Sequence, residues 1–251
     1  LSALSSNPLY IHRTMSLSSK AWDRFLDLAL GANMAQINRV EWLTDALYPF
    51  LSITELEQLA TEPPHRFLSV KVLNHIANQE IRRHTELLAM GSAGSSLTGC
   101  IATWVGIPTE LAQYSVNLVL LTQKLAYLYG WDDFYSYGAV TAETKARITF
   151  MMGSMLGIRE ADALLRNACR SYQGQVSITP MPYVGDRSPI DKVIAEISKR
   201  LLVLSAKGGV TAWIGRKAPL IGVTLGASTS YLLVKPSLVR LKVLLRDLMQ
   251  E

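Results

Sequence analysis

The sequence predicts an all-α protein, a multi-helix bundle whose central helices are rich in glycine and closely packed. Apolar residues recur at helical spacing along nearly the whole chain, and no segment alternates apolar and polar residues as a strand would. Proline, glycine and capping residues divide this pattern into segments of ordinary helix length. Hydrophobic residues occupy 49% of the 251 positions, which is enough to fill a substantial buried core.

The first third of the chain contains clear signals for helix starts and stops. Ser18 or Ser19 can cap a first helix. Ser52 and Glu55 have the spacing of a capping box that opens a short helix. The Pro63–Pro64 pair then forces a break. Helices are predicted over residues 18–30, 36–48, 52–60 and 65–90.

Proline and glycine also divide the rest of the chain. Pro108 fits the first turn of a helix that Gly130 ends, with a positive φ expected at this glycine. Asp132 is expected to cap the turn that follows. Pro236 is expected to begin the last helix. Helices are predicted over residues 108–129, 141–156, 160–172, 189–206 and from 236 onward.

The predicted organisation is an irregular arm over residues 1–17 and a single helical domain over residues 18–251. Residues 173–188 contain two prolines and two glycines with little periodicity, so they form a soft internal boundary. This boundary is weak because apolar helices are expected on both sides of it to share one core.

Two runs without charged residues, Leu87–Thr109 and Ala218–Val234, are the most informative segments. The first is long enough to span a hydrocarbon layer of about 30 Å. Both runs, however, are rich in Gly, Ala and Ser, and glycine at four-residue spacing lets helix backbones approach closely. We therefore expect Leu87–Gly106 to pack against Ala218–Val234, inside the protein or in lipid.

Charge is distributed unevenly along the chain. Residues 1–186 carry 14 Lys and Arg against 16 Asp and Glu, a net of −2, whereas residues 187–251 carry 11 against 4, a net of +7. Such a basic quarter suits an anionic membrane surface or an acidic protein partner, and a solvated helix face is the plain alternative. No nucleic acid is expected. The candidate binding residues are Lys207, Arg216, Lys217, Arg240, Lys242 and Arg246.

Catalytic, metal and cofactor motifs are not expected in this chain. Glu80 and His84 are one helical turn apart, but an ion-paired solvent face explains them better than a metal. Asp132 and Asp133 lie among aromatic residues, where an acidic cap explains them better than acid–base chemistry. The two cysteines, Cys100 and Cys169, lie in apolar surroundings, and we expect buried free thiols.

A family resemblance is strongest over residues 87–160 and 200–245. The glycine-rich run leads to Pro108-Thr-Glu110 and then to a helix that contains Gln123 and Ala126 and closes on Tyr129-Gly130-Trp-Asp132. The later stretch Ala218–Ala227 contains Pro-Leu-Ile-Gly followed by Gly-Ala. Together these segments resemble the EcsC family of bacterial proteins. The resemblance implies a helical protein of the bacterial cytoplasm, including the periphery of the inner membrane, and it supplies no catalytic residue.

Three functions fit these observations. The first is a non-enzymatic helical protein that acts at the membrane or in a protein complex. The second is a soluble adaptor or immunity-type protein whose glycine-rich helices form its core. The third is a colicin-like pore former that hides an apolar hairpin. An enzyme is least favoured, because no set of polar residues converges in the sequence.

Overall fold

The computed structural model describes residues 22–27, 29–30, 35–89, 109–135, 140–170, 188–200 and 219–251. Within these ranges the chain is helical and contains no strand, which confirms the all-α fold. The helices are α2 (Arg39–Leu47), α3 (Ile53–Gln58), η1 (Pro64–Arg66), α4 (Val70–Ala89), α6 (Thr109–Leu128), α7 (Ala142–Met155), α8 (Arg159–Arg170) and α10 (Pro219–Gln250). Residues 22–27, 29–30 and 188–200 are helical as well.

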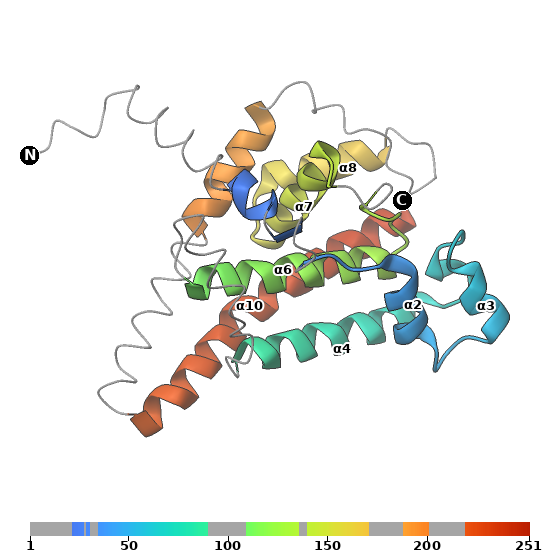
Figure 1. Ribbon diagram of the computed structural model, residues 1–251, viewed down its shortest axis with the longest axis horizontal. Coiled ribbons are helices and arrows are strands. Elements are labelled where there is room, and N and C mark those ends of the chain that lie inside the picture. The colour runs from blue at the N-terminus through green and yellow to red at the C-terminus, as the bar shows by residue number, and fades with distance from the viewer. Residues whose placement is uncertain are drawn as a thin grey trace, which may run out of the picture.

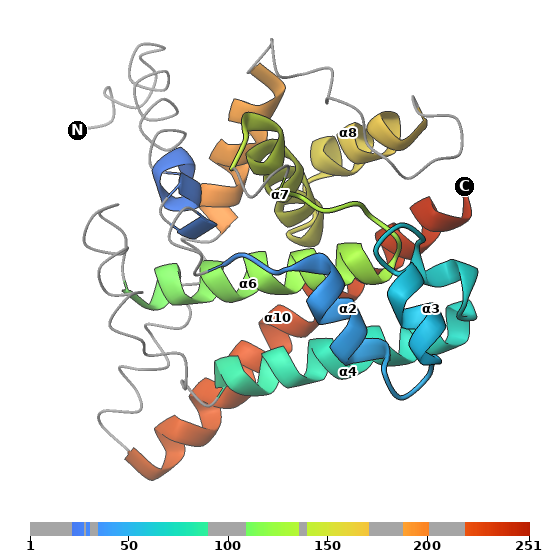
Figure 2. The same ribbon diagram turned by 45° about the vertical axis from the view of Figure 1, so that its right-hand side comes forward.

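Three long helices, α4, α6 and α10, form the centre of the bundle (Figure 1). The pair α4 and α10 has the most extensive contact, and α6 packs against both. The short helices α7 and α8 pack on each other and against α6 and α10 (Figure 2). One apolar core connects these elements from Trp22 to Leu248. The small helices α2 and α3 lie at one end of the bundle, beside α6 and α4.

Several local predictions are confirmed. The Ser52 side chain accepts a hydrogen bond from the Glu55 amide, and the Glu55 carboxylate accepts one from the Ser52 amide, so the capping box is present. The helix predicted from residue 141 is present as α7, and Thr141 caps it by accepting a hydrogen bond from the Thr144 amide. The helix predicted from residue 65 begins later, at Val70, because Pro64–Arg66 form a separate 3₁₀ turn.

The end of α6 follows the prediction at Gly130 and departs from it at Asp132. Gly130 has a φ of 91°, and a Cβ there would lie 3.0 Å from the His65 side chain. No helical turn follows in residues 131–135, so Asp132 caps nothing. The carboxylate of Asp133 holds this loop instead, because it accepts hydrogen bonds from the Tyr135 amide (3.1 Å) and from the buried Tyr127 hydroxyl (3.2 Å).

The expectation that Pro236 begins a helix is wrong. Helix α10 runs from Pro219 to Gln250 with Pro236 inside it. A proline inside a helix removes one backbone hydrogen bond. Pro236 itself is exposed. The following residues, Leu238 to Leu248, pack into the core and hold the helix continuous.

The predicted contact between the glycine-rich runs lies outside the described residues. Neither residues 90–108 nor the side chains of residues 219–234 are among them. The boundary predicted at 173–188 also lies almost wholly outside the described residues. Close approach at a glycine does occur elsewhere, at Gly153 in α7. A Cβ there would lie 2.8 Å from Ala161 Cβ and 2.8 Å from Val193 Cγ1.

None of the helices in the described ranges combines the length and the apolar character that a membrane crossing requires.

Candidate functional site

Three exposed apolar side chains lie between the end of α2 and the start of α3. Tyr48 at the end of α2 is 69% exposed, Ile53 at the start of α3 is 74% exposed, and Phe50 between them is 43% exposed. These are large side chains that proteins usually place at least partly inside. Single exposed apolar residues are common, but several grouped on one turn indicate a surface that another molecule covers.

The charges within this segment of the chain all have one sign, although Lys124 of α6 lies over the Trp42 ring of α2 and Arg66 pairs with Glu62. Residues 40–62 contain five carboxylates and no Lys, Arg or His. Glu41 and Asp45 are four residues apart and share the exposed face of α2 with Tyr48. Glu41 lies in the first turn of α2, where a negative charge favours the helix dipole, whereas the like charge of Asp45 four residues later costs a few tenths of a kcal/mol. We call Tyr48, Phe50 and Ile53 with Glu41, Asp45 and Glu57 the acidic corner.

The carboxylates of the acidic corner are available to a partner. Glu41, Asp45 and Glu57 are exposed, and within the described part of the chain none of the three forms an ion pair. Glu55 and Glu62 differ, because Glu55 completes the capping box and Glu62 pairs with Arg66 at 3.2 Å.

A buried arginine holds the acidic corner to the bundle. Arg39, in the first turn of α2, is 6% exposed. Its Nε donates to the Trp131 carbonyl (3.0 Å) and its Nη1 donates to the Leu59 carbonyl (2.6 Å). Burial lowers the pKa of Arg39, and the nearby carboxylates of Asp132 and Asp133 oppose this shift. One side chain therefore joins the start of α2, the end of α3 and the loop after α6.

A second buried group, Gln123 in α6, fixes the segment that enters α2. Its Nε2 donates to the Ala35 carbonyl (2.5 Å), and its Oε1 accepts from the Ile37 amide (3.1 Å) and the Tyr135 hydroxyl (2.9 Å). Gln123 is fully buried. With Arg39, this network sets the acidic corner on a rigid base.

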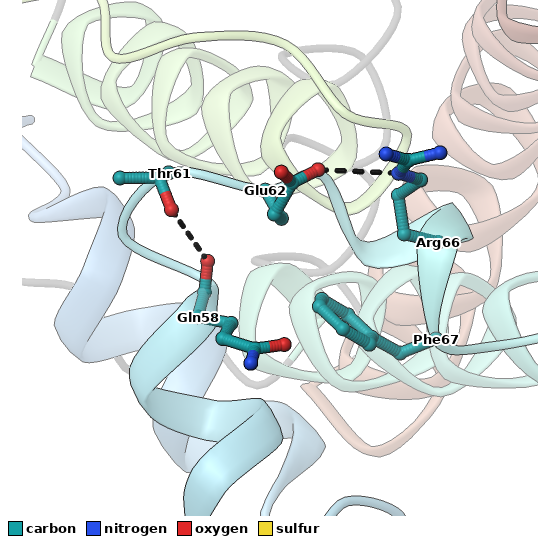
Figure 3. Close-up of a pocket in the computed structure, with 5 residues that line it drawn as sticks. All are labelled: Gln58, Thr61, Glu62, Arg66 and Phe67. Atoms are coloured by element: carbon teal, nitrogen blue, oxygen red, sulfur yellow. Dashed lines mark hydrogen bonds and ion pairs between the residues drawn. The ribbon is translucent and has the colours of Figure 1, made fainter.

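A small pocket lies beside the acidic corner, between α3 and the start of α4 (Figure 3). The Arg66 side chain on its rim is already paired with Glu62, and the Thr61 hydroxyl donates to the Gln58 carbonyl. Phe67 supplies the apolar lining. The side chains of Arg66, Glu62 and Thr61 are therefore already bonded within the protein.

The basic residues predicted to bind an anionic partner are only partly within the described chain. Lys207, Arg216 and Lys217 lie outside it. On α10, Lys242 donates to Asn78 of α4 at 2.8 Å, and burial together with Arg246 lowers its pKa.

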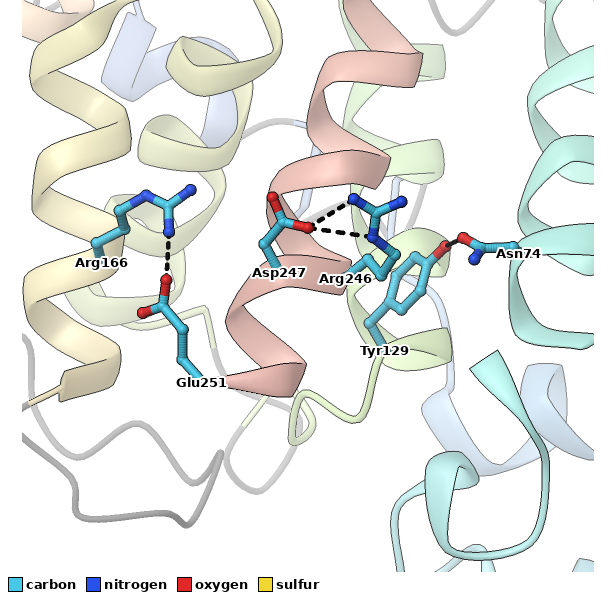
Figure 4. Close-up of polar contacts among 6 residues, drawn as sticks. All are labelled: Asn74, Tyr129, Arg166, Arg246, Asp247 and Glu251. Atoms are coloured by element: carbon cyan, nitrogen blue, oxygen red, sulfur yellow. Dashed lines mark hydrogen bonds and ion pairs between the residues drawn. The ribbon is translucent and has the colours of Figure 1, made fainter. Parts of the chain in front are cut away.

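The end of α10 is joined to its neighbours by polar contacts (Figure 4). Arg246 pairs with the adjacent Asp247 at 2.7 Å. Glu251 pairs with Arg166 of α8 at 2.5 Å. The hydroxyl of Tyr129, the residue after α6, donates to Asn74 of α4 at 2.8 Å, in the same layer of contacts. Arg246 therefore belongs to this interhelical layer.

Arg240 is the predicted residue with the most accessible charge. It is exposed, and none of the described carboxylates pairs with it. Its Nη1 lies 1.8 Å from the position that a Cβ on Gly157 would take, and Arg200 Nη1 lies 3.5 Å from the same point. Arg200 also donates to the Leu156 carbonyl and approaches Glu196 at 3.5 Å. Two guanidinium groups thus meet at the turn between α7 and α8.

The histidine and glutamate considered for a metal form an ion-paired interface instead. Glu80 pairs with Lys124 of α6 at 2.9 Å, and its carboxylate lies 3.8 Å from His84. Burial, with repulsion from Lys124, lowers the pKa of His84 to about 4, so its ring is neutral. Among the described residues no three His, Cys, Asp or Glu side chains gather to hold a metal ion.

Comparisons of the chain with family models, with curated proteins and with solved structures found no match. The site is therefore argued from geometry alone. Our sequence analysis missed the acidic corner because it averaged charge over residues 1–186. A shorter window would have found the acidic run at 40–62, but the exposure of Tyr48 and Ile53 has no signal in the sequence.

Proposed function

We propose that this chain is a non-enzymatic helical protein that works in a protein complex and that the acidic corner is its docking surface. The observation that carries the proposal is the exposure of Tyr48 and Ile53 on a rigid base. Burying such a side chain at an interface gains roughly 1.5–3 kcal/mol. Because Arg39 and Gln123 already fix the backbone beneath, docking would cost little ordering entropy.

Photo-crosslinking in the living host tests this proposal. A benzoylphenylalanine in place of Tyr48 should give one adduct of defined mass, whereas the same group at Gln79, which is exposed on α4, should give none. Replacing Asp45 and Glu57 with Lys should remove the adduct without changing the circular dichroism spectrum. Equal adducts from both positions, or an adduct that survives the charge reversal, would refute a docking role for the acidic corner.

A second candidate function is contact with an anionic membrane surface, and the meeting of Arg200 and Arg240 favours it. Each basic group near such a surface contributes about 1 kcal/mol, which salt screens. Flotation with anionic vesicles should then weaken in the variants Arg240→Gln and Arg216→Gln/Lys217→Gln. Partitioning that is equal for neutral and anionic vesicles would remove this candidate.

Membership of the EcsC family and a location in the bacterial cytoplasm, including the periphery of the inner membrane, are further parts of the proposal. They rest on the sequence resemblance alone. The adaptor reading agrees best with the acidic corner, because a docking surface with exposed carboxylates is repelled by an anionic membrane.

A further inference from the structure

The chemistry of the acidic corner defines what covers it. We infer that its occupant is a basic amphipathic segment of another protein, whose apolar face covers Tyr48 and Ile53 and whose Lys or Arg side chains pair with Asp45 and Glu57. This inference rests on the proposed function and specifies the partner.

Helices α2 and α3 each place a carboxylate beside an exposed apolar side chain. On α2, Asp45 lies three residues before Tyr48, so the carboxylate and the ring are neighbours on one helix face. On α3, Glu57 lies four residues after Ile53, which again places a carboxylate beside an exposed apolar side chain. Each apolar contact therefore has an anionic neighbour. A partner that matches both must alternate apolar and cationic side chains across one face, as a basic amphipathic helix does.

Other occupants fit less well. Nucleic acid and anionic lipid are repelled by the five carboxylates of residues 40–62. An acidic protein is repelled for the same reason. A second copy of this chain could offer the exposed Arg240, but Lys242 is bonded to Asn78 and Arg246 to Asp247. Among the described residues no large apolar side chain of α10 is exposed beside Arg240 to cover Tyr48 and Ile53. Charge complementarity therefore favours a different protein with free basic side chains.

A synthetic peptide of about 18 residues, or five helical turns, is a direct probe. It places Leu on one face and Lys on the other. The first control has the same composition in scrambled order, and the second has Glu in place of Lys. Because the whole protein carries a net charge of +5, a cationic peptide gains no general attraction to it. Binding is measured by fluorescence anisotropy of the labelled peptide.

The expected result is saturable binding of the Leu/Lys peptide, at least tenfold tighter than that of either control. Ile53→Ala should weaken it about tenfold by removing apolar contact area, as for a residue at the centre of an interface. Asp45→Asn with Glu57→Gln should weaken it by a similar factor and flatten its salt dependence. Glu160→Gln, an exposed carboxylate on α8, is the matched control and should have no effect.

Equal affinity of the ordered and scrambled peptides, or unchanged affinity in the variants of the acidic corner, would overturn the inference. Sedimentation of the protein alone tests the second copy as occupant. Self-association that Ile53→Asp abolishes would also overturn the inference. If the peptide fails to bind while Tyr48 still gives its specific crosslink in cells, the inferred chemistry is wrong and the docking function stands.

Discussion

Replacing Gln123 with leucine tests how strongly the buried network supports the bundle. Leucine has a similar volume, so the change removes hydrogen bonds with little change in packing. Three groups lose a partner: the Ala35 carbonyl, the Ile37 amide and the Tyr135 hydroxyl. Ala35 and Ile37 lie more than 80 residues away in sequence, so no local structure replaces these bonds.

The magnitude follows from counting the orphaned groups. A buried donor or acceptor without a partner costs roughly 1–3 kcal/mol. The Ala35 carbonyl keeps a long contact of 3.4 Å with the Tyr135 hydroxyl, and Ile37 is only partly buried, so both costs are reduced. We expect the free energy of unfolding to fall by about 3 kcal/mol. For a chain of this size that lowers Tm by roughly 6–12 °C.

The assay is urea unfolding followed by tryptophan fluorescence, with Tyr135→Phe completing a double-mutant cycle. Alone, Tyr135→Phe should cost about 1 kcal/mol, because one hydrogen bond is lost. In the Gln123→Leu background it should cost clearly less, since its main partner is already gone and only the long contact with the Ala35 carbonyl remains to be lost. Gln79→Leu, the same substitution at an exposed site on α4, should change stability by less than about 0.5 kcal/mol.

A loss below about 1 kcal/mol for Gln123→Leu would refute the reasoning, because even one orphaned buried group should cost that much. Additive costs in the cycle would also contradict it, since they would mean that Gln123 and Tyr135 act independently.

Three further predictions concern single sites. The pKa of His84 falls from its usual 6.5 to about 4 in the folded protein, so the unfolded chain takes up the proton first. Stability should therefore be complete above about pH 6.5, decline by about 3 kcal/mol toward pH 4, and vary less with pH in His84→Gln, as acid titration of the unfolding curve would measure. Gly153→Ala should lower the free energy of unfolding by about 1–3 kcal/mol, because its Cβ would lie 2.8 Å from the core atoms of Ala161 and Val193; a denaturation midpoint equal to that of the wild type would contradict this. Burial raises the pKa of the Cys169 thiol to about 11, so in a Cys100→Ser background it should react slowly with a disulfide reagent at pH 8 and rapidly in urea; equal rates would show that the thiol is accessible.

The sequence by itself determined the features that depend on a few neighbouring residues. The all-α class, the capping box at Ser52–Glu55, the helix start near Thr141 and the helix end at Gly130 were all predicted correctly. Each depends on local geometry: a side chain that reaches an amide three residues away, or a φ that only glycine adopts without strain.

Only the tertiary structure decided the rest. Asp133, and not Asp132, accepts the hydrogen bonds of the loop after α6, because the Tyr127 hydroxyl lies within reach of it. Pro236 stayed inside α10 because the leucines after it pack into the core. The exposure of the acidic corner also depends on tertiary contacts. Sequence gives the residue types of Tyr48 and Ile53, but their exposure depends on which face of α2 and α3 the rest of the chain covers. That choice is made by contacts between residues far apart in sequence, as between Arg39 and Trp131, and no local pattern contains them.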